Sequence, residues 1–106
     1  ASAREVAKAS GAIVVLKGDD TLVVDRDRVA VNPLSSPALA TAGTGDVLSG
    51  TIGALLARGV DPFAAACAGV FAHARAGLAA AAGIGEAESV IATDVIEALP
   101  IGLSRP

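Results

Sequence analysis

The stretch that decides how this chain is organised is Thr41-Ala42-Gly43-Thr44-Gly45-Asp46-Val47-Leu48-Ser49-Gly50. It separates two kinds of sequence pattern. Before it, the residues up to Asn32 form short Val-rich runs that are typical of strands. After it, apolar residues recur at helical spacing. The sequence therefore predicts an α/β fold in which a glycine-rich loop joins the strands to the helices.

The strand-forming half contains three candidate strands. Ala12–Leu16 is a continuous apolar run, which favours a strand covered on both faces, as in a parallel sheet between helices. Thr21–Asp25 and Arg28–Asn32 are separated by two polar residues and predict a β-hairpin at the edge of that sheet. Before them, we expect a helix over Ser2–Ser10 that ends at Gly11.

The second half predicts three helices. The first begins within the glycine-rich loop and ends at Gly59. The second begins at Asp61-Pro62, with Asp at the cap and Pro at the first helical position, and runs to about Ala82. The third is capped by Thr93-Asp94 and stopped by Pro100.

Composition excludes several function classes. With 53% hydrophobic and 18% charged residues, the chain is too apolar for intrinsic disorder. Its net charge of -3 provides no basic stripe, so we expect no nucleic-acid partner. The longest apolar segment, Pro62–Ala82, is interrupted by His73 and Arg75, so we expect no membrane span.

Size and cysteine usage add two expectations. A chain of 106 residues with a mean hydropathy of +0.63 is too apolar for a free-standing small domain, which predicts a piece of a larger one. The single cysteine, Cys67, forms no internal disulfide, which fits a cytoplasmic protein. Because it stands among alanines, we expect Cys67 to be a small buried hydrophobic residue.

The glycine-rich loop has the composition of an anion site. Backbone N–H groups around Gly43 and Gly45 can converge on an anion, together with the positive end of the helix that follows. The P-loop motif does not fit, because Asp46-Val47 stands where it needs Lys-Ser/Thr. The dinucleotide fingerprint does not fit either, because Leu48 takes the place of its third glycine. By loop geometry, the anion hole is Gly43, Thr44 and Gly45.

An acid at an anion site requires an explanation. The Asp46 carboxylate would repel a bound phosphate, so its presence there calls for a function. It could accept the proton of an attacking hydroxyl while the loop holds the moving phosphoryl group. The alternative is that Asp46 is an ordinary helix-capping acid and the glycines form an ordinary turn.

Two separated motifs carry a family resemblance. The segment Asn32–Gly50, with the upstream Val14–Thr21, resembles the C-terminal half of the ADP-dependent NAD(P)H-hydrate dehydratases of the ribokinase-like superfamily. The resemblance implies a three-layer α/β/α sandwich, of which residues 1–106 would be the C-terminal part of a single domain. The missing N-terminal part would be required for activity.

The resemblance also implies a reaction. Hydrated NADH or NADPH would be restored by phosphorylation of its hydroxyl from ADP, followed by loss of phosphate. Asp46 matches the acid that contacts the hydrate and would be the catalytic base, and Gly45 matches a nucleotide contact. The nucleotide-binding turn would consist of Lys17, Gly18, Asp19, Asp20 and Thr21. We expect Mg2+ with the nucleotide, without ligands that the sequence identifies.

Other interpretations stay open. One is a ribokinase-like small-molecule kinase acting on a sugar, a vitamin precursor or a thiazole alcohol, and another is a catalytically silent nucleotide-binding module. Lys17 would then be a solvated lysine at a strand end. His73, alone in an Ala-rich helix, is expected to be a packed or partly exposed side chain rather than a ligand. We also expect a homo-oligomer.

Overall fold

The computed structural model describes residues 2–18, 20–34, 37–40 and 43–103. The elements, in chain order, are α1 (Ala3–Ser10), β1 (Val14–Leu16), β2 (Thr21–Val24), β3 (Val29–Asn32), the 3-10 turn η1 (Pro37–Ala40), α2 (Thr44–Ala57), α3 (Pro62–Ile84), the 3-10 turn η2 (Ala87–Ser89) and α4 (Ala92–Leu103).

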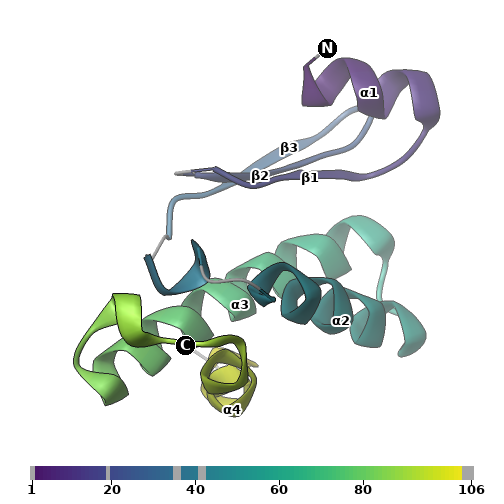
Figure 1. Ribbon diagram of the computed structural model, residues 1–106. Coiled ribbons are helices and arrows are strands. Elements are labelled where there is room, and N and C mark those ends of the chain that lie inside the picture. Colours follow the sequence, from purple (N-terminus) through teal and green to yellow (C-terminus); the bar gives the residue numbers. More distant parts are fainter. Residues whose placement is uncertain (1, 19, 35–36, 41–42, 104–106) are drawn as a thin grey trace.

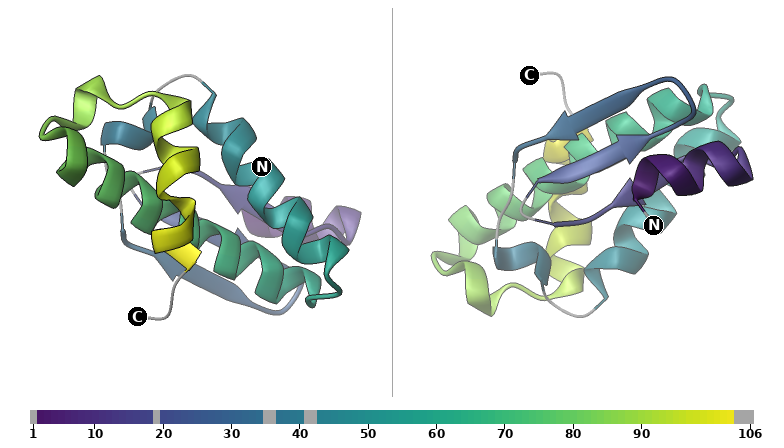
Figure 2. Two further views of the ribbon diagram at one scale, coloured as in Figure 1. Left: turned by 90° about the horizontal axis from the view of Figure 1, so that it is seen from below. Right: turned by 90° about the horizontal axis from the view of Figure 1, so that it is seen from above.

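The elements lie in layers around a small sheet. Helix α1 lies on one side of the sheet, and α2 and α3 lie on the other (Figure 1). The two further views agree: α2, α3 and α4 are in front when the molecule is seen from below, and the strands and α1 are in front when it is seen from above (Figure 2). This is part of an α/β/α sandwich, as the sequence predicts.

The sheet is antiparallel, with the order β1-β2-β3. Val15 pairs with Val23, and Val23 pairs in turn with Ala30. Within the described residues the first strand therefore has one neighbour, which is antiparallel, and the parallel pairing expected for it is not seen there. The physical reason is the connection: β1 is joined to β2 by residues 17–20, whereas a parallel crossover needs roughly a dozen residues or more.

The first strand is also shorter and more exposed than expected. It spans Val14–Leu16 rather than Ala12–Leu16, and Leu16 is 50% exposed. The hairpin of β2 and β3 is confirmed. Its turn is closed by Asp25, whose carboxylate accepts the Asp27 and Arg28 N–H groups and pairs with the Arg28 guanidinium. This arrangement lowers the pKa of Asp25.

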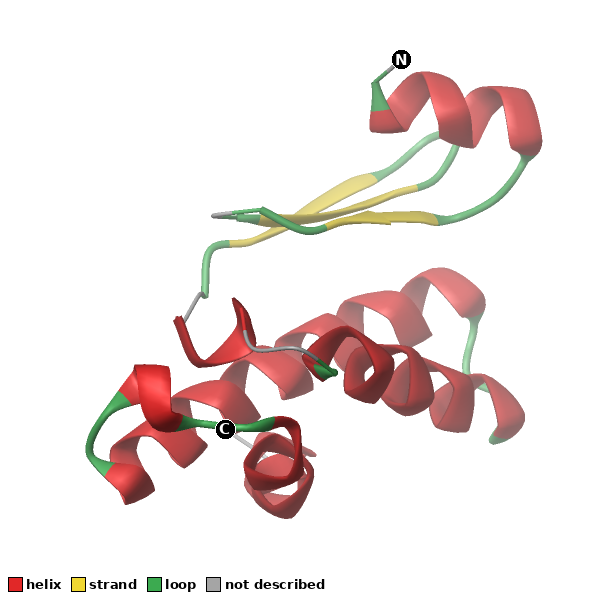
Figure 3. Cartoon of the chain, viewed as in Figure 1, coloured by secondary structure: helices red, strands yellow, loops and turns green. Residues whose placement is uncertain are grey.

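Helix α3 is the centre of the helical layer (Figure 3). Small residues let its neighbours approach closely. A Cβ on Gly69 would lie 2.5 Å from Ile52 Cγ1 of α2, and a Cβ on Gly77 would lie 2.6 Å from a Leu39 methyl of η1. The glycine and alanine content of this half of the chain thus serves close packing.

The same helix is long and apolar enough, by length and composition, to cross a membrane. However, 56% of its apolar window is buried inside the fold, against α2, η1 and α4. Its apolar character is therefore explained by its place in the core.

Two helix ends differ from the expected ones. Helix α3 continues beyond Ala82 and ends at Gly85, which has a φ of +91°. Helix α4 passes through Pro100 to Leu103, so the prediction that this proline stops it is wrong. Contacts with α3 hold the last turn, because Arg75 Nη1 donates to the Gly102 carbonyl at 3.2 Å.

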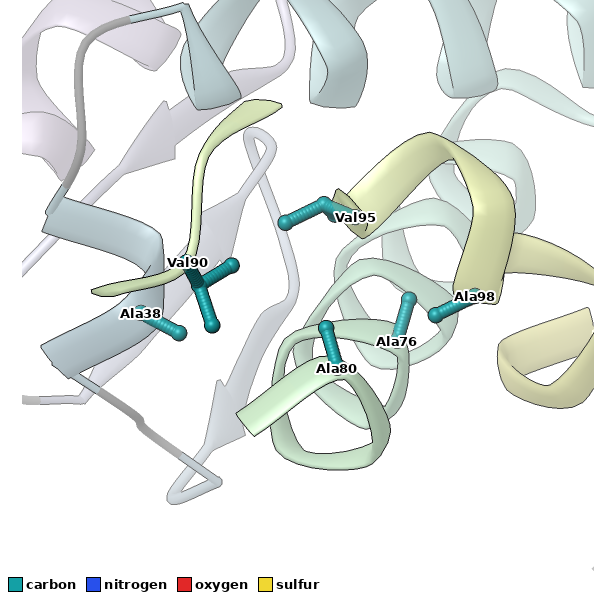
Figure 4. Close-up of a cluster of buried hydrophobic side chains, with 6 residues drawn as sticks. All are labelled: Ala38, Ala76, Ala80, Val90, Val95 and Ala98. Atoms are coloured by element: carbon teal, nitrogen blue, oxygen red, sulfur yellow. The ribbon is translucent and has the colours of Figure 1, made fainter. Parts of the chain in front are cut away.

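The core has two apolar clusters. One joins α3 and α4 to η1 and the segment before α4 (Figure 4), and consists of Ala38, Ala76, Ala80, Val90, Val95 and Ala98. The other lies between the sheet and helices α2 and α3, and consists of Val23, Leu48, Ala66 and Val70. The second cluster ties the strands to the helices and so sets the distance between the two predicted motifs.

The contact between α4 and α3 predicts a stability effect. A Cβ on Gly102 would overlap the Ala72 carbonyl oxygen, so Gly102→Ala should lower the free energy of unfolding of the full-length protein by about 1–3 kcal/mol. Gly53→Ala is the matched control: it also lies in a helix, nothing lies within 4 Å of its added Cβ, and it should stabilise by about 0.5–1 kcal/mol. Equal denaturant midpoints for the two variants would contradict this packing.

Candidate functional site

The predicted anion loop leads directly into α2. Gly43 is the N-cap residue with a φ of +90°, a conformation that favours glycine, and a Cβ there would lie 3.2 Å from the Ala92 Cβ. The first helical hydrogen bond runs from Val47 N–H to the Gly43 carbonyl at 3.3 Å. The N–H groups of Gly45 and Asp46 therefore lie in the first turn, where no intrahelical acceptor exists for them.

Thr44 fixes this loop from inside. Its side chain is 1% exposed, and its Oγ1 donates to the Leu39 carbonyl at 2.6 Å. Its own carbonyl oxygen lies 2.9 Å from His73 Nε2 of α3. Because the hydroxyl is directed at Leu39, the contribution of Thr44 to an anion hole would come from its backbone.

Lys17, the first residue of the predicted nucleotide-binding turn, lies close to the glycine-rich loop. It follows β1, is exposed, and its Nζ lies 3.8 Å from the position that a Cβ on Gly45 would occupy. An ammonium group and the N-terminal turn of a helix thus lie side by side, although 28 residues of sequence separate them. Both attract anions.

Backbone conformation does not explain why glycine stands at position 45. Its φ lies outside the left-handed region, and it occupies a helical position where alanine would be favoured. The open space beside it, next to Lys17, is therefore available to a ligand that approaches the backbone closely.

The rest of the predicted nucleotide-binding turn is compact. A Cβ on Gly18 would lie 3.3 Å from the Asp20 carbonyl oxygen, and Asp20 is exposed. Thr21 begins β2 and pairs with Asn32. Asp19 lies outside the described residues.

Asp46 is the third residue of α2 and is exposed. Gly43, not Asp46, holds the N-cap position, and Asp46 is an acid of the first turn, where a negative charge interacts favourably with the helix dipole. None of the described residues forms a hydrogen bond or an ion pair with its carboxylate. The exposed carboxylate thus lies in the same helical turn as the candidate anion site.

His73 is the site residue that the sequence analysis missed. It is packed, as expected, and 2% exposed, but its Nε2 meets the Thr44 carbonyl. Since a carbonyl oxygen accepts only, Nε2 carries the proton. Burial lowers the pKa of His73, the hydrogen bond to Thr44 opposes this, and the charge of Lys17 lowers the pKa further. The available signal was a lone polar residue on the apolar face of an Ala-rich helix.

A protein-held metal site does not fit the described residues. They contain no group of three or more His, Cys, Asp or Glu side chains that could hold a metal ion. Any Mg2+ at the loop would be ligated mainly by phosphate oxygens and water, which is common for this ion.

A cavity of about 430 Å³ lies elsewhere, between the sheet and α3. Its lining is apolar apart from Asn32 and includes none of the predicted site residues. It consists of Val23, Ala30, Val31, Asn32, Pro33, Leu34, Cys67, Val70 and Phe71. Burial raises the pKa of the Cys67 thiol, in keeping with a packing role, although this residue is half-buried rather than buried.

Comparisons with known proteins point to one family. A family model described as NAD(P)H-hydrate dehydratase matches residues 1–101. The chain is similar to an ADP-dependent (S)-NAD(P)H-hydrate dehydratase of Neisseria meningitidis, with 52% identity over 77 residues. It is also similar to a bifunctional NAD(P)H-hydrate repair enzyme Nnr of Hyperthermus butylicus, with 39% identity over 104 residues.

The chain spans a small part of these relatives. The matches cover 72% and 98% of this chain, but 26% and 19% of the two proteins. A solved structure is similar as well: the ADP/ATP-dependent NAD(P)H-hydrate dehydratase of Bacillus subtilis, co-crystallised with ATP/Mg2+. The TM-score is 0.85 at 31% sequence identity, over 94% of this chain and 36% of that one.

The buried histidine predicts a pH dependence of stability. Because the folded state holds the pKa of His73 below its ordinary value of 6.5, the unfolded state binds the proton first as the pH falls. The contribution of His73 is therefore complete above pH 6.5 and is lost progressively below it. In the full-length protein, the denaturant midpoint of the parent should fall more between pH 7.5 and pH 5 than that of His73→Gln, because glutamine at position 73 does not titrate. Parallel profiles would contradict the shift.

Proposed function

Because the chain belongs to the NAD(P)H-hydrate dehydratase family, we propose that it supplies the phosphate-binding side and the catalytic base of an ADP-dependent NAD(P)H-hydrate dehydratase. One observation carries this proposal. The Lys17 ammonium lies beside Gly45 in the first turn of α2, and Asp46 presents an exposed carboxylate in that same turn.

The loop binds the phosphates of ADP. Backbone N–H groups of Gly43–Gly45 and the positive end of α2 hold the phosphate oxygens, and Lys17 adds a mobile positive charge. The missing side chain at Gly45 lets the phosphoryl group approach the backbone. Mg2+ bound to the nucleotide would add charge neutralisation without a dedicated set of protein ligands.

Asp46 acts on the substrate hydroxyl. The hydroxyl of hydrated NADH or NADPH gives its proton to the Asp46 carboxylate, and its oxygen attacks the β-phosphorus of ADP. A new P–O bond forms, the bond between the β-phosphorus and the bridging oxygen breaks, and AMP leaves. The phosphorylated carbon then loses inorganic phosphate while the neighbouring nitrogen supplies electrons, and the ring double bond returns after loss of a proton.

The rest of the active site would come from the part of the protein outside residues 1–106. Among the described residues, the edge of β1 away from β2 has no partner strand. Leu16, the last residue of this edge strand, is 50% exposed. Further strands of the same domain would pair with this edge of β1 and provide the contacts to the nicotinamide ring.

Replacing Gly45 tests the close approach of phosphate. Gly45→Ala should weaken ADP binding by about 10–100-fold, because a methyl group blocks a charge-assisted hydrogen bond worth roughly 1.5–3 kcal/mol. The same change should not destabilise the fold, since alanine is the better helix former. Gly53→Ala in the same helix is the control and should leave binding unchanged. Calorimetric titration of the full-length variants with ADP measures the two affinities. Equal ADP affinities of Gly45→Ala and Gly53→Ala would refute the anion hole.

Replacing Asp46 tests the base. Asp46→Asn keeps the size of the side chain but removes the proton acceptor, so turnover should fall by roughly 10²–10⁴-fold. ADP affinity should stay unchanged or rise slightly, because a repulsion with phosphate disappears. Recovery of nicotinamide absorbance from hydrated NADH in the presence of ADP measures turnover.

A matched control is Asp61→Asn. Asp61 is the N-cap of α3 and accepts from Ala64 N–H at 3.1 Å, a role that asparagine fills equally well. This variant should keep parental turnover. If Asp46→Asn also keeps it, another base or the silent-module interpretation must replace this mechanism. Phosphorylation of an unrelated alcohol without dehydration would instead favour the small-molecule kinase.

A further inference from the structure

We propose that His73 is a positioning residue for the anion loop: by binding the Thr44 carbonyl, it orients the Thr44–Gly45 peptide so that the Gly45 N–H points at the phosphate. The inference rests on the proposed function in taking the anion to be a phosphate of ADP. His73 itself does not contact the reacting atoms.

Peptide geometry links the histidine to the anion donor. The carbonyl of Thr44 and the N–H of Gly45 belong to one peptide unit, which is planar and trans, so the two groups point in opposite directions. Nε2 of His73 holds the carbonyl at 2.9 Å on the buried side. The Gly45 N–H is therefore held away from the interior, toward the partly exposed side of Gly45.

The composition of α3 sets His73 apart from the other buried residues of this helix. Apart from His73, the buried residues of this helix are the small residues Ala65, Ala66, Gly69, Val70, Ala72, Ala74, Ala76, Gly77 and Ala80. An imidazole that is 2% exposed is costly to bury unless its polar atoms are hydrogen-bonded. His73 Nε2 bonds to the Thr44 carbonyl oxygen, 29 residues away in sequence.

Thr44 has a second anchor, which acts differently. Its Oγ1 bond to the Leu39 carbonyl fixes the side chain and the position of the Thr44 Cα. The following peptide plane turns about the Thr44 ψ angle, which the first turn of α2 also restrains. The His73 bond adds a restraint on this peptide plane from outside the helix, at the end of α2 where helices fray, and so helps to hold the direction of the Gly45 N–H.

Three variants of the full-length protein test the inference. His73→Gln keeps an N–H donor at nearly the same reach, and His73→Leu removes the donor but keeps an apolar side chain. His73→Asn has a donor that is too short to reach Thr44. ADP affinity should fall about tenfold in the Leu and Asn variants, as expected for one misplaced hydrogen bond of about 1.4 kcal/mol. It should stay within about threefold of the parent in the Gln variant.

The second readout is the Gly45 amide resonance without ligand. The Leu and Asn variants lose the hydrogen bond to the Thr44 carbonyl, so this resonance should shift in both. The Gln variant keeps the hydrogen bond, so the resonance should stay at its parental position. A merely structural role would not produce this rescue pattern. If the Leu variant unfolds at the assay temperature, the Asn variant alone makes the comparison with Gln.

The outcomes separate this inference from the proposed function. If the parent does not bind ADP, the proposed function fails, while the Gly45 resonance still tests the anchor. If the parent binds ADP and the Leu or Asn variant binds it equally well, or the Gln variant binds as weakly as Leu, the inference about His73 is overturned.

Discussion

The close approach of three elements to α3 is the constraint on which the rest of the structure depends. Glycine at positions 69 and 77 of α3 and at 102 of α4 removes the side chains that would hold α2, η1 and α4 away from it. Dense packing then fixes the start of α2 relative to the interior of the fold. If α3 carried larger side chains, Thr44 and His73 would be too far apart to bond.

Much of the fold follows from local sequence signals. Ser2 and Asp61 accept the capping hydrogen bonds of α1 and α3, and Gly11 and Gly85 end these helices in the left-handed conformation. Such signals act over a few residues and are therefore readable. The continuation of α4 through Pro100 was not readable, because it depends on contacts that α4 makes with α3, far away in sequence.

The candidate site divides in the same way. The glycines and Asp46 form a local pattern, so the sequence indicated an anion loop with an acid beside it. The proximity of Lys17 to Gly45 followed from the resemblance of two motifs rather than from any spacing rule. His73 stood out as a lone polar residue in an Ala-rich helix, but its bond to Thr44 could not be predicted, because the two residues belong to different helices.

The charges around Gly45 have a consequence for selectivity. In the proposed anion site, backbone dipoles and the Lys17 ammonium would select for negative charge and size but not for the chemical identity of the ligand. Inorganic phosphate, sulfate and any nucleotide would all satisfy them. Discrimination among phosphate compounds must therefore come from surfaces that contact the base, the sugar and the acceptor. If the loop binds phosphate as proposed, the same loop would serve enzymes with unrelated substrates, while the surfaces that contact the rest of the substrate vary.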